Sequence, residues 1–301
     1  MKLTSWKLIV LLIGLTGCGS GVQTVKLTSV ETSKGGHGNE VVVLPESLMQ
    51  STNCQIVGKV FMEKKGSGFE PIRDEYIVKN LKESAQSIGG DILVGLHYSN
   101  YCGGEPTSRR KWASALVGKR GTESSGAKRA SLGVAILPPS DISVDVDSTM
   151  RVEENMVVVG TAQYYLETAG YYAWPARTVT PITARSIKNN PPAELDTLGG
   201  PFAANILLIE WVVEGAATSP VPNTEGRFKA SLFSKGSRSI VWEDSTARTF
   251  PTLSGALGLV TGGVFGIVNA FASNPRAQML YKGMKELFEN LRPPPDAVVS
   301  D

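Results

Sequence analysis

The first twenty residues constrain this chain most, because they indicate that it folds after export. They read MKLTSWKLIVLLIGLTGCGS, with basic Lys2 and Lys7 ahead of an apolar run over residues 8–15. A basic start, a short apolar core and a small-residue end are typical of a secretory signal. The apolar run is too short for a hydrocarbon layer about 30 Å thick, which needs about 20 such residues. We therefore expect residues 1–17 to be a removable signal peptide.

The signal ends in Leu15-Thr16-Gly17-Cys18. This motif resembles the lipobox of bacterial lipoproteins. The resemblance implies cleavage before Cys18, diacylglycerol on its sulfur, and a further acyl chain such as palmitate on the new amino group. Several acyl chains anchor a protein stably where one is marginal. Gly19 stands where Asp would retain such a protein in the inner membrane, which implies an outer-membrane location facing the periplasm. The alternative is an ordinary signal peptide followed by an incidental cysteine.

Composition bounds the size of the fold and the class of partner. The chain has 301 residues, of which 42% are hydrophobic, and this is enough for two domains with cores of their own. Its net charge is +2, from 30 basic and 28 acidic residues, so it lacks the electrostatic footprint of a nucleic-acid-binding protein. We expect partners among other envelope proteins, with the membrane reached through the lipid anchor, and no nucleic acid.

Two cysteines remain once Cys18 is acylated. Cys54 and Cys102 would meet an oxidising compartment, and the sequence predicts that they form a disulfide. Closing a loop of about 48 residues would stabilise the fold by about 4 kcal/mol. The alternatives are two free thiols or a metal pair with His97. No metal or cofactor is predicted.

Runs of small polar residues divide the chain. Residues rich in Gly, Ser and Thr read as a tether and a linker. The fold expected on either side of the linker is α+β or α/β, with helices packed on a sheet in each of two small domains. The segments are a signal peptide at 1–17, a lipidated tether at 18–39, an α+β domain at 40–119, a linker at 120–131, a βαβ-type domain at 132–293 and a tail at 294–301.

The first domain contains a helix between predicted strands. Ile77, Leu81, Ala85 and Ile88 recur with helical spacing after Asp74, and Gly89 supplies a stop. Strands are predicted at 41–44, 55–62, 91–98 and 112–119. The segment Cys54-Gln-Ile-Val-Gly-Lys-Val, with the helix end Ala85-Gln-Ser-Ile-Gly-Gly-Asp-Ile-Leu-Val, resembles the small domain of the Rcs stress-sensor lipoprotein and its relatives. That resemblance, over residues 41–119, implies a role in envelope stress sensing.

The second domain alternates strands and helices. Its predicted elements are strands at 132–137, 171–173, 204–214, 226–233 and 239–248, and helices at 151–168, 191–198 and 275–292. The segments Val-Ala-Ile-Leu-Pro-Pro, Ala203-Ala-Asn-Ile-Leu-Leu-Ile-Glu-Trp and Ala230-Ser-Leu-Phe-Ser-Lys-Gly-Ser-Arg-Ser-Ile-Val-Trp-Glu243 resemble lipoproteins related to the curli secretion lipoprotein and the TolB amino-terminal fold. The resemblance covers residues 132–292 and implies fold more than function.

An apolar segment at 254–272 carries Gly258, Gly262 and Gly266 four residues apart. On a helix these glycines would form one ridge that lets another backbone come close. Three interpretations are open: a helix packed on its own sheet, an oligomer interface, or a segment that inserts in the membrane.

Signatures of catalysis are absent from the sequence. It has no phosphate-binding loop, no Gly-x-Ser-x-Gly and no His-Glu-x-x-His. A histidine-based site would have to use His97, and Glu210, in an apolar strand, is the other acid or base considered; we interpret both as structural. The leading hypothesis is a non-catalytic lipid-anchored module that binds envelope proteins in assembly, transport or stress sensing. The alternative is a membrane-embedded oligomeric component of a secretion or transport system.

Overall fold

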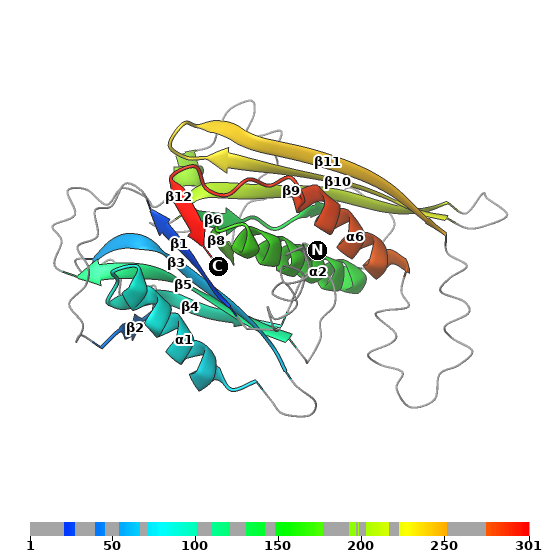
Figure 1. The fold of residues 1–301 in the computed structure, drawn as a ribbon. Coiled ribbons are helices and arrows are strands. Elements are labelled where there is room, and N and C mark those ends of the chain that lie inside the picture. Colours follow the sequence, from blue (N-terminus) through cyan, green and yellow to red (C-terminus); the bar gives the residue numbers. More distant parts are fainter. Residues whose placement is uncertain are drawn as a thin grey trace, which may run out of the picture.

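Two mixed β-sheets and the helices that pack on them form an α+β fold, as the sequence predicts (Figure 1). The structure is a computed structural model. It describes residues 21–27, 40–45, 54–66, 72–100, 110–120, 131–141, 148–176, 193–196, 198, 203–216, 223–251 and 275–300. The lipobox with Cys18, His37, Cys102 and the glycine segment at 254–272 lie outside these ranges. Within them, no helix is both long enough and apolar enough to cross a membrane.

The first sheet brings together strands from both ends of the chain. Its order is β12 (Ala297–Ser300), β1 (Val22–Leu27), β3 (Cys54–Lys65), β5 (Arg110–Arg120), β4 (Ile92–Ser99) and β2 (Val42–Leu44). Helix α1 (Asp74–Ser87) covers one face and buries Ile77, Leu81 and Ala85, which confirms the predicted helix. Its N-cap is the extended residue Arg73, so Asp74 is the first helical residue and not the cap.

The two strands at the chain ends differ from the sequence expectation. Residues 18–39 were expected to form a flexible tether and 294–301 a tail, yet β1 lies inside the sheet between β12 and β3. Val25 in β1 is fully buried. A short strand among polar residues has little local signal, and its partners here lie far away in the sequence. Only residues 19–21 therefore separate Cys18 from the first strand.

The second sheet carries two long helices on one face. Its order is β11 (Ser239–Pro251), β10 (Asn223–Ser234), β9 (Ala203–Ala216), β6 (Gly133–Ile136) and β8 (Tyr172–Pro175), and β7 (Ser140–Asp141) pairs with β9. Helices α2 (Ser148–Thr168) and α6 (Pro275–Phe288) share a core with this face, and the short helix η3 (Ala193–Asp196) contributes Leu195 to the core on the other face. Gly283 is needed in α6, because a Cβ there would lie 2.2 Å from the Phe228 ring.

The strand register argues against the predicted disulfide between Cys54 and Cys102. Cys54 lies opposite Arg120 on β5, whereas Ser99, the last residue of β4, lies opposite Trp112. Eight residues of strand, about 26 Å, separate these two positions along the sheet. Three residues from Ser99 to Cys102 reach about 11 Å, and a disulfide requires Cα atoms closer than about 7 Å. Cys54 carries a free thiol in this structure.

We therefore expect two free thiols in the Cys18→Ser protein. Alkylation under denaturing, non-reducing conditions should add two labels by mass, one at Cys54 and one at Cys102. In the native state Cys54 should react slowly, because burial and, to a smaller extent, nearby Asp91 raise the pKa of its thiol to about 11. Two labels only after reduction would show that the disulfide exists and that the register is wrong.

A buried polar junction beside an apolar groove

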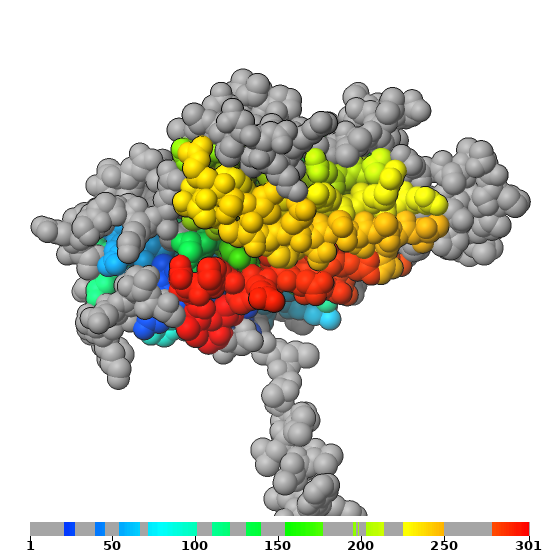
Figure 2. Space-filling view, turned by 90° about the horizontal axis from the view of Figure 1, so that it is seen from above, coloured from blue at the N-terminus to red at the C-terminus, as the bar shows by residue number. Residues whose placement is uncertain are grey.

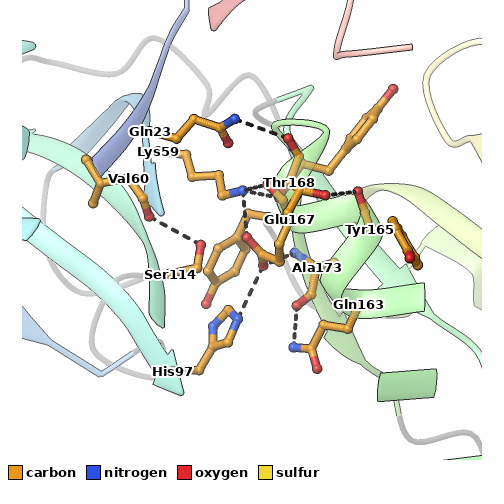
Figure 3. A network of polar contacts seen from close by, with 12 residues as sticks. Gln23, Lys59, Val60, His97, Ser114, Gln163, Tyr165, Glu167, Thr168 and Ala173 are labelled. Carbon is orange, nitrogen blue, oxygen red and sulfur yellow. Dashed lines mark hydrogen bonds and ion pairs between the residues drawn. The ribbon is translucent and has the colours of Figure 1, made fainter. Parts of the chain in front are cut away.

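A fully buried lysine joins the two sheets. Lys59 lies on β3 opposite Val25, on the face of the first sheet turned away from α1, and its side chain is 0% exposed. The Nζ atom lies 2.6 Å from the backbone oxygens of Glu167 and Tyr171 and 2.6 Å from Glu167 Oε2 (Figure 3). Two hydrogen bonds and one ion-pair contact thus surround the ammonium group, which is what makes its burial tolerable.

These contacts cap the carboxyl end of α2 with side chains from the other sheet. The last carbonyls of a helix have no partner within the helix and carry partial negative charge. Lys59 donates to the carbonyl of Glu167, and Gln23 of β1 donates to that of Thr168 at 3.2 Å. Gly170, with φ of 99°, reverses the chain so that β8 can follow. The helix end is therefore completed only when the two sheets are together.

Glu167 is the acidic partner at the junction. Its Oε1 accepts a hydrogen bond from the backbone N–H of Ala173 at 2.8 Å and lies 3.2 Å from His97 Nε2. Burial would raise the pKa of this carboxyl, but the Lys59 ammonium, His97 and the Ala173 N–H together hold it below its usual value. Burial lowers the pKa of Lys59, against the opposing effect of Glu167. The 2.6 Å separation of Lys59 Nζ and Glu167 Oε2 is the geometry of an ion pair.

Aromatic rings enclose His97. It packs edge-on against Trp112, with ring centroids 5.4 Å apart, and against Tyr172 at 5.1 Å. The Tyr172 hydroxyl donates to the carbonyl of Gly95 at 2.6 Å. Gly95 has φ of 63°, and a Cβ there would lie 2.2 Å from that hydroxyl, so a larger residue would displace Tyr172. Ring packing and this close approach fix the imidazole in place.

The geometry of His97 agrees with the structural role that the sequence favours. Nδ1 lies 3.2 Å from the Gly95 carbonyl oxygen and Nε2 lies 3.2 Å from the Glu167 carboxylate. Both ring nitrogens therefore face oxygen atoms of the protein itself. Ser114, opposite His97 on β5, is fully buried and donates to the Val60 carbonyl instead. Among the described residues no group of His, Cys, Asp and Glu side chains has the arrangement of a metal site.

Glu210 lies away from the junction. The predicted alternation along β9 is confirmed, since Ile206 and Leu208 pack on one face and Leu207 and Ile209 on the other. Glu210 is half-buried and lies opposite Lys229 of β10 in the register. Its carboxylate is thus placed beside a basic strand neighbour and not in the apolar core.

The basic residues of β5 have acidic partners. Arg110 lies 3.5 Å from Glu63, Lys111 pairs with Asp74, and Arg120 pairs with Asp91 at 3.2 Å. These ion pairs neutralise this part of the basic stretch locally. Arg120 belongs to β5, whereas the remainder of the expected linker, residues 121–130, lies outside the described ranges.

A groove of about 480 Å³ lies beside the junction, where β4 of the first sheet meets the second. It is formed at the carboxyl ends of the parallel strands β6 and β8, a position at which α/β sheets commonly bind ligands. None of the described residues that line it is charged. The lining residues are Ser99, Ile136, Pro138, Pro139, Asn155, Met156, Val159, Gly160, Gln163, Pro175 and Ala176.

Met156 and two amides define the chemistry of the groove. Met156 is 61% exposed, which is high for a large apolar side chain. Asn155 Oδ1 accepts a hydrogen bond from Trp211 Nε1 at 3.2 Å, and Gln163 Nε2 donates to the Ala173 carbonyl at 2.8 Å. Each amide therefore makes one hydrogen bond within the protein. The Asn155 N–H groups can donate to a bound molecule, and the Gln163 side-chain oxygen can accept from it.

Sequence reasoning missed the residues of the junction and the groove. Lys59 was read only as part of an alternating strand, although it shares a face with Phe61 between buried neighbours. Glu167 stands in the last turn of a predicted helix just before its glycine stop. A charged residue on the apolar face of an element was the available signal, but no local pattern indicates that Lys59 and Glu167 meet.

No family model and no curated protein matches this sequence. The resemblances of residues 41–119 and 132–292 to named lipoprotein families therefore stay predictions.

Solved structures similar to about half of the chain include three bacterial proteins. A lipoprotein from Neisseria meningitidis is 22% identical, with a TM-score of 0.29 over 47% of this chain and 99% of its own. A hypothetical protein from Chlamydia trachomatis is 12% identical, with a TM-score of 0.34 over 52% of this chain and 92% of its own. The PelC dodecamer from Paraburkholderia phytofirmans is 12% identical, with a TM-score of 0.30 over 54% and 88%.

Proposed function

We propose that this chain is a non-catalytic lipoprotein of the bacterial cell envelope, anchored through Cys18, and that it binds an extended apolar segment of a partner protein in the groove. Such binding would serve envelope assembly, transport or stress sensing. The observation that carries the proposal is the uncharged groove between the two sheets, with an exposed Met156 and two half-used amides.

The two amides favour a peptide over an acyl chain. A peptide offers both N–H and C=O groups, which complement the Gln163 oxygen and the Asn155 N–H. An acyl chain would cover the same amides without replacing their hydrogen bonds to water, which is unfavourable. Methionine adapts its shape readily and suits a groove that accepts varied apolar side chains.

The short tether would hold the groove close to the membrane. From Cys18 to Val22 the chain reaches about 14 Å at most. Val22 lies opposite Met62, Met62 opposite Ala113, and Ala113 opposite Tyr98, the neighbour of groove residue Ser99. The anchored end of β1 and the groove therefore lie at the same end of the first sheet. A partner protein would therefore bind close to the membrane that holds the lipid anchor.

Photo-crosslinking in living cells tests this proposal. A benzophenone amino acid replaces Met156 in the groove or, as a control, Tyr76, which is 44% exposed on α1. Both are made in the acylated protein and in Cys18→Ser. We expect a discrete protein adduct from position 156 alone, and its loss when Gly160→Phe fills the groove. Fractionation should place the acylated protein in the outer membrane and Cys18→Ser in the soluble periplasm.

Other outcomes contradict the proposal in distinct ways. Equal adducts from positions 156 and 76, or an adduct that persists with Gly160→Phe, would place the partner elsewhere. An adduct with lipid in place of protein would make the groove an acyl-chain site. Retention of Cys18→Ser in the membrane would contradict anchoring through Cys18 and support the alternative of an inserted segment at 254–272.

A further inference from the structure

Strand β11 presents a long unpaired edge. It runs over 13 residues, Ser239–Pro251, and pairs on one side with β10 along its whole length. On the other side it pairs with no strand among the described residues. Figure 2 shows the yellow to gold of β11 on the surface, beside the orange-red of α6. An edge of this length leaves a row of backbone donors and acceptors that favours pairing with another chain.

A bulge and a proline, two features that protect such an edge, lie only near its ends. A bulge displaces Val241 near the start, where the register shifts between Leu232 and Phe233, and Pro251 stands at the finish. Between them, residues 242–250 contain no proline, no lysine and no register shift. The middle of β11 is therefore regular, and pairing there requires that the Ser245 N–H exchange its hydrogen bond to the Asp244 side chain for one to the new strand.

We infer that the β11 edge pairs antiparallel with β11 of a second copy of this chain, so that two second sheets become one continuous sheet. Two copies related by a two-fold axis present the same surface to each other. The two-fold axis that relates two antiparallel strands is perpendicular to the sheet. One residue of each copy therefore lies at the axis and faces the same residue of the other copy. Residues equally far before and after it then face each other.

Charge selects the residue on that axis. An axis at Glu243, Asp244 or Arg248 would set like charges directly opposite, which is unfavourable. With Ser245 or Ala247 on the axis, no charged residue of one copy lies opposite a residue of the other sign in the second copy. An axis at Thr246 places Asp244 opposite Arg248 twice, once on each side. The geometry of two-fold pairing thus points to Thr246 as the centre.

The groups that already face Arg248 leave it able to make this contact. Its Nε and Nη2 atoms bind Glu286 of α6, and no contact of Nη1 with another described residue would prevent it from donating to Asp244 of the partner. Asp244 accepts from Asn290 at 3.5 Å and from the backbone N–H of Ser245. A guanidinium has five donors in a planar fork and can bind two carboxylates at once.

Helix α6 leaves room for the second copy. It packs over both outer strands, through Gly283 on Phe228 of β10 and through Phe288 stacked on Trp242 of β11. A new strand added about 4.8 Å from β11 would therefore bring the two α6 helices to about 10 Å from each other. That is the ordinary distance between packed helices, so the helical layer continues along with the sheet.

Cysteine crosslinking tests the register in the full chain. Thr246→Cys and the control Ala247→Cys are each made in a protein whose own Cys18, Cys54 and Cys102 are replaced by Ser. At position 246 the two Cα atoms would be about 5 Å apart, within disulfide range. At position 247 each cysteine would face Ser245 of the partner, and the Cα atoms of the two cysteines would be about 8 Å apart. We expect mild oxidation to give a covalent dimer with Thr246→Cys only.

Sedimentation of Cys18→Ser with its native Thr246 gives an independent measurement. We expect a reversible dimer, and Asp244→Lys should weaken it at least tenfold, because it would set Lys opposite Arg248. Ser245→Lys, which lies on the other face, is the matched control and should weaken it less. A monomer at all concentrations, equal crosslinking at 246 and 247, or a dimer insensitive to Asp244→Lys would each overturn the proposal. These readouts do not depend on occupancy of the groove.

Discussion

Glu167→Gln should lower the free energy of unfolding by about 3–5 kcal/mol. The substitution removes the carboxylate and leaves the Lys59 ammonium fully buried beside two carbonyl oxygens and a neutral amide. Breaking one side of a buried ion pair has a cost of this size, because the remaining charge has lost both water and its partner. Urea unfolding of the Cys18→Ser protein, followed by tryptophan fluorescence, measures the change.

The double variant Lys59→Met/Glu167→Met is the matched control. Removing both charges leaves no uncompensated ion, and apolar replacements of buried pairs are often neutral or stabilising. We expect the double variant to be more stable than either single variant, which makes the two effects strongly non-additive. Single variants that lose less than about 1 kcal/mol would show that the junction is hydrated in solution.

Acid should weaken the junction in a defined direction. The pKa of Glu167 lies below its ordinary value of 4.5 in the folded protein and returns to it on unfolding. The carboxylate therefore contributes stability above that pH, and the contribution is lost as the pH falls through the folded pKa. In the double methionine variant this part of the acid sensitivity should disappear.

Trp112→Ala should also destabilise the protein by about 3–5 kcal/mol, the range for large-to-small changes of a buried aromatic residue. Trp112 is fully buried on β5 and packs against Phe61 and the ring of His97. Tyr164 of α2 packs against the same aromatic cluster, so the cavity would open where the two sheets meet. Thermal unfolding of the full chain measures the loss.

Two further variants separate burial from surface effects. Trp112→Phe keeps most of the aromatic volume and should cost less than half as much. Tyr76→Ala, on the exposed face of α1, should change the stability by less than about 0.5 kcal/mol. Equal losses at positions 112 and 76 would mean that Trp112 does not lie in the core.

Local patterns in the sequence predicted individual elements well. The spacing of Ile77, Leu81 and Ala85 predicted α1, and the alternation along 204–214 predicted β9 with its two faces. Both signals are strong, because α1 buries one face at helical spacing and β9 is a long apolar run whose successive side chains pack on opposite faces of the sheet. No such period predicts the contacts of Lys59 with Glu167 and of Val22 with Met62, since each contact depends on how separate elements pack.

What the sequence by itself determined is the α+β class and most of the helices and strands, while the export signal with a cysteine at its end stays a prediction. The tertiary structure decided that residues 22–27 and 297–300 complete the first sheet, and that Cys54 lies far from the end of β4. It also decided that a lysine of one sheet caps a helix of the other. Periodicity reports which side of an element is buried, whereas its partners are fixed by long-range pairing and the burial of charge.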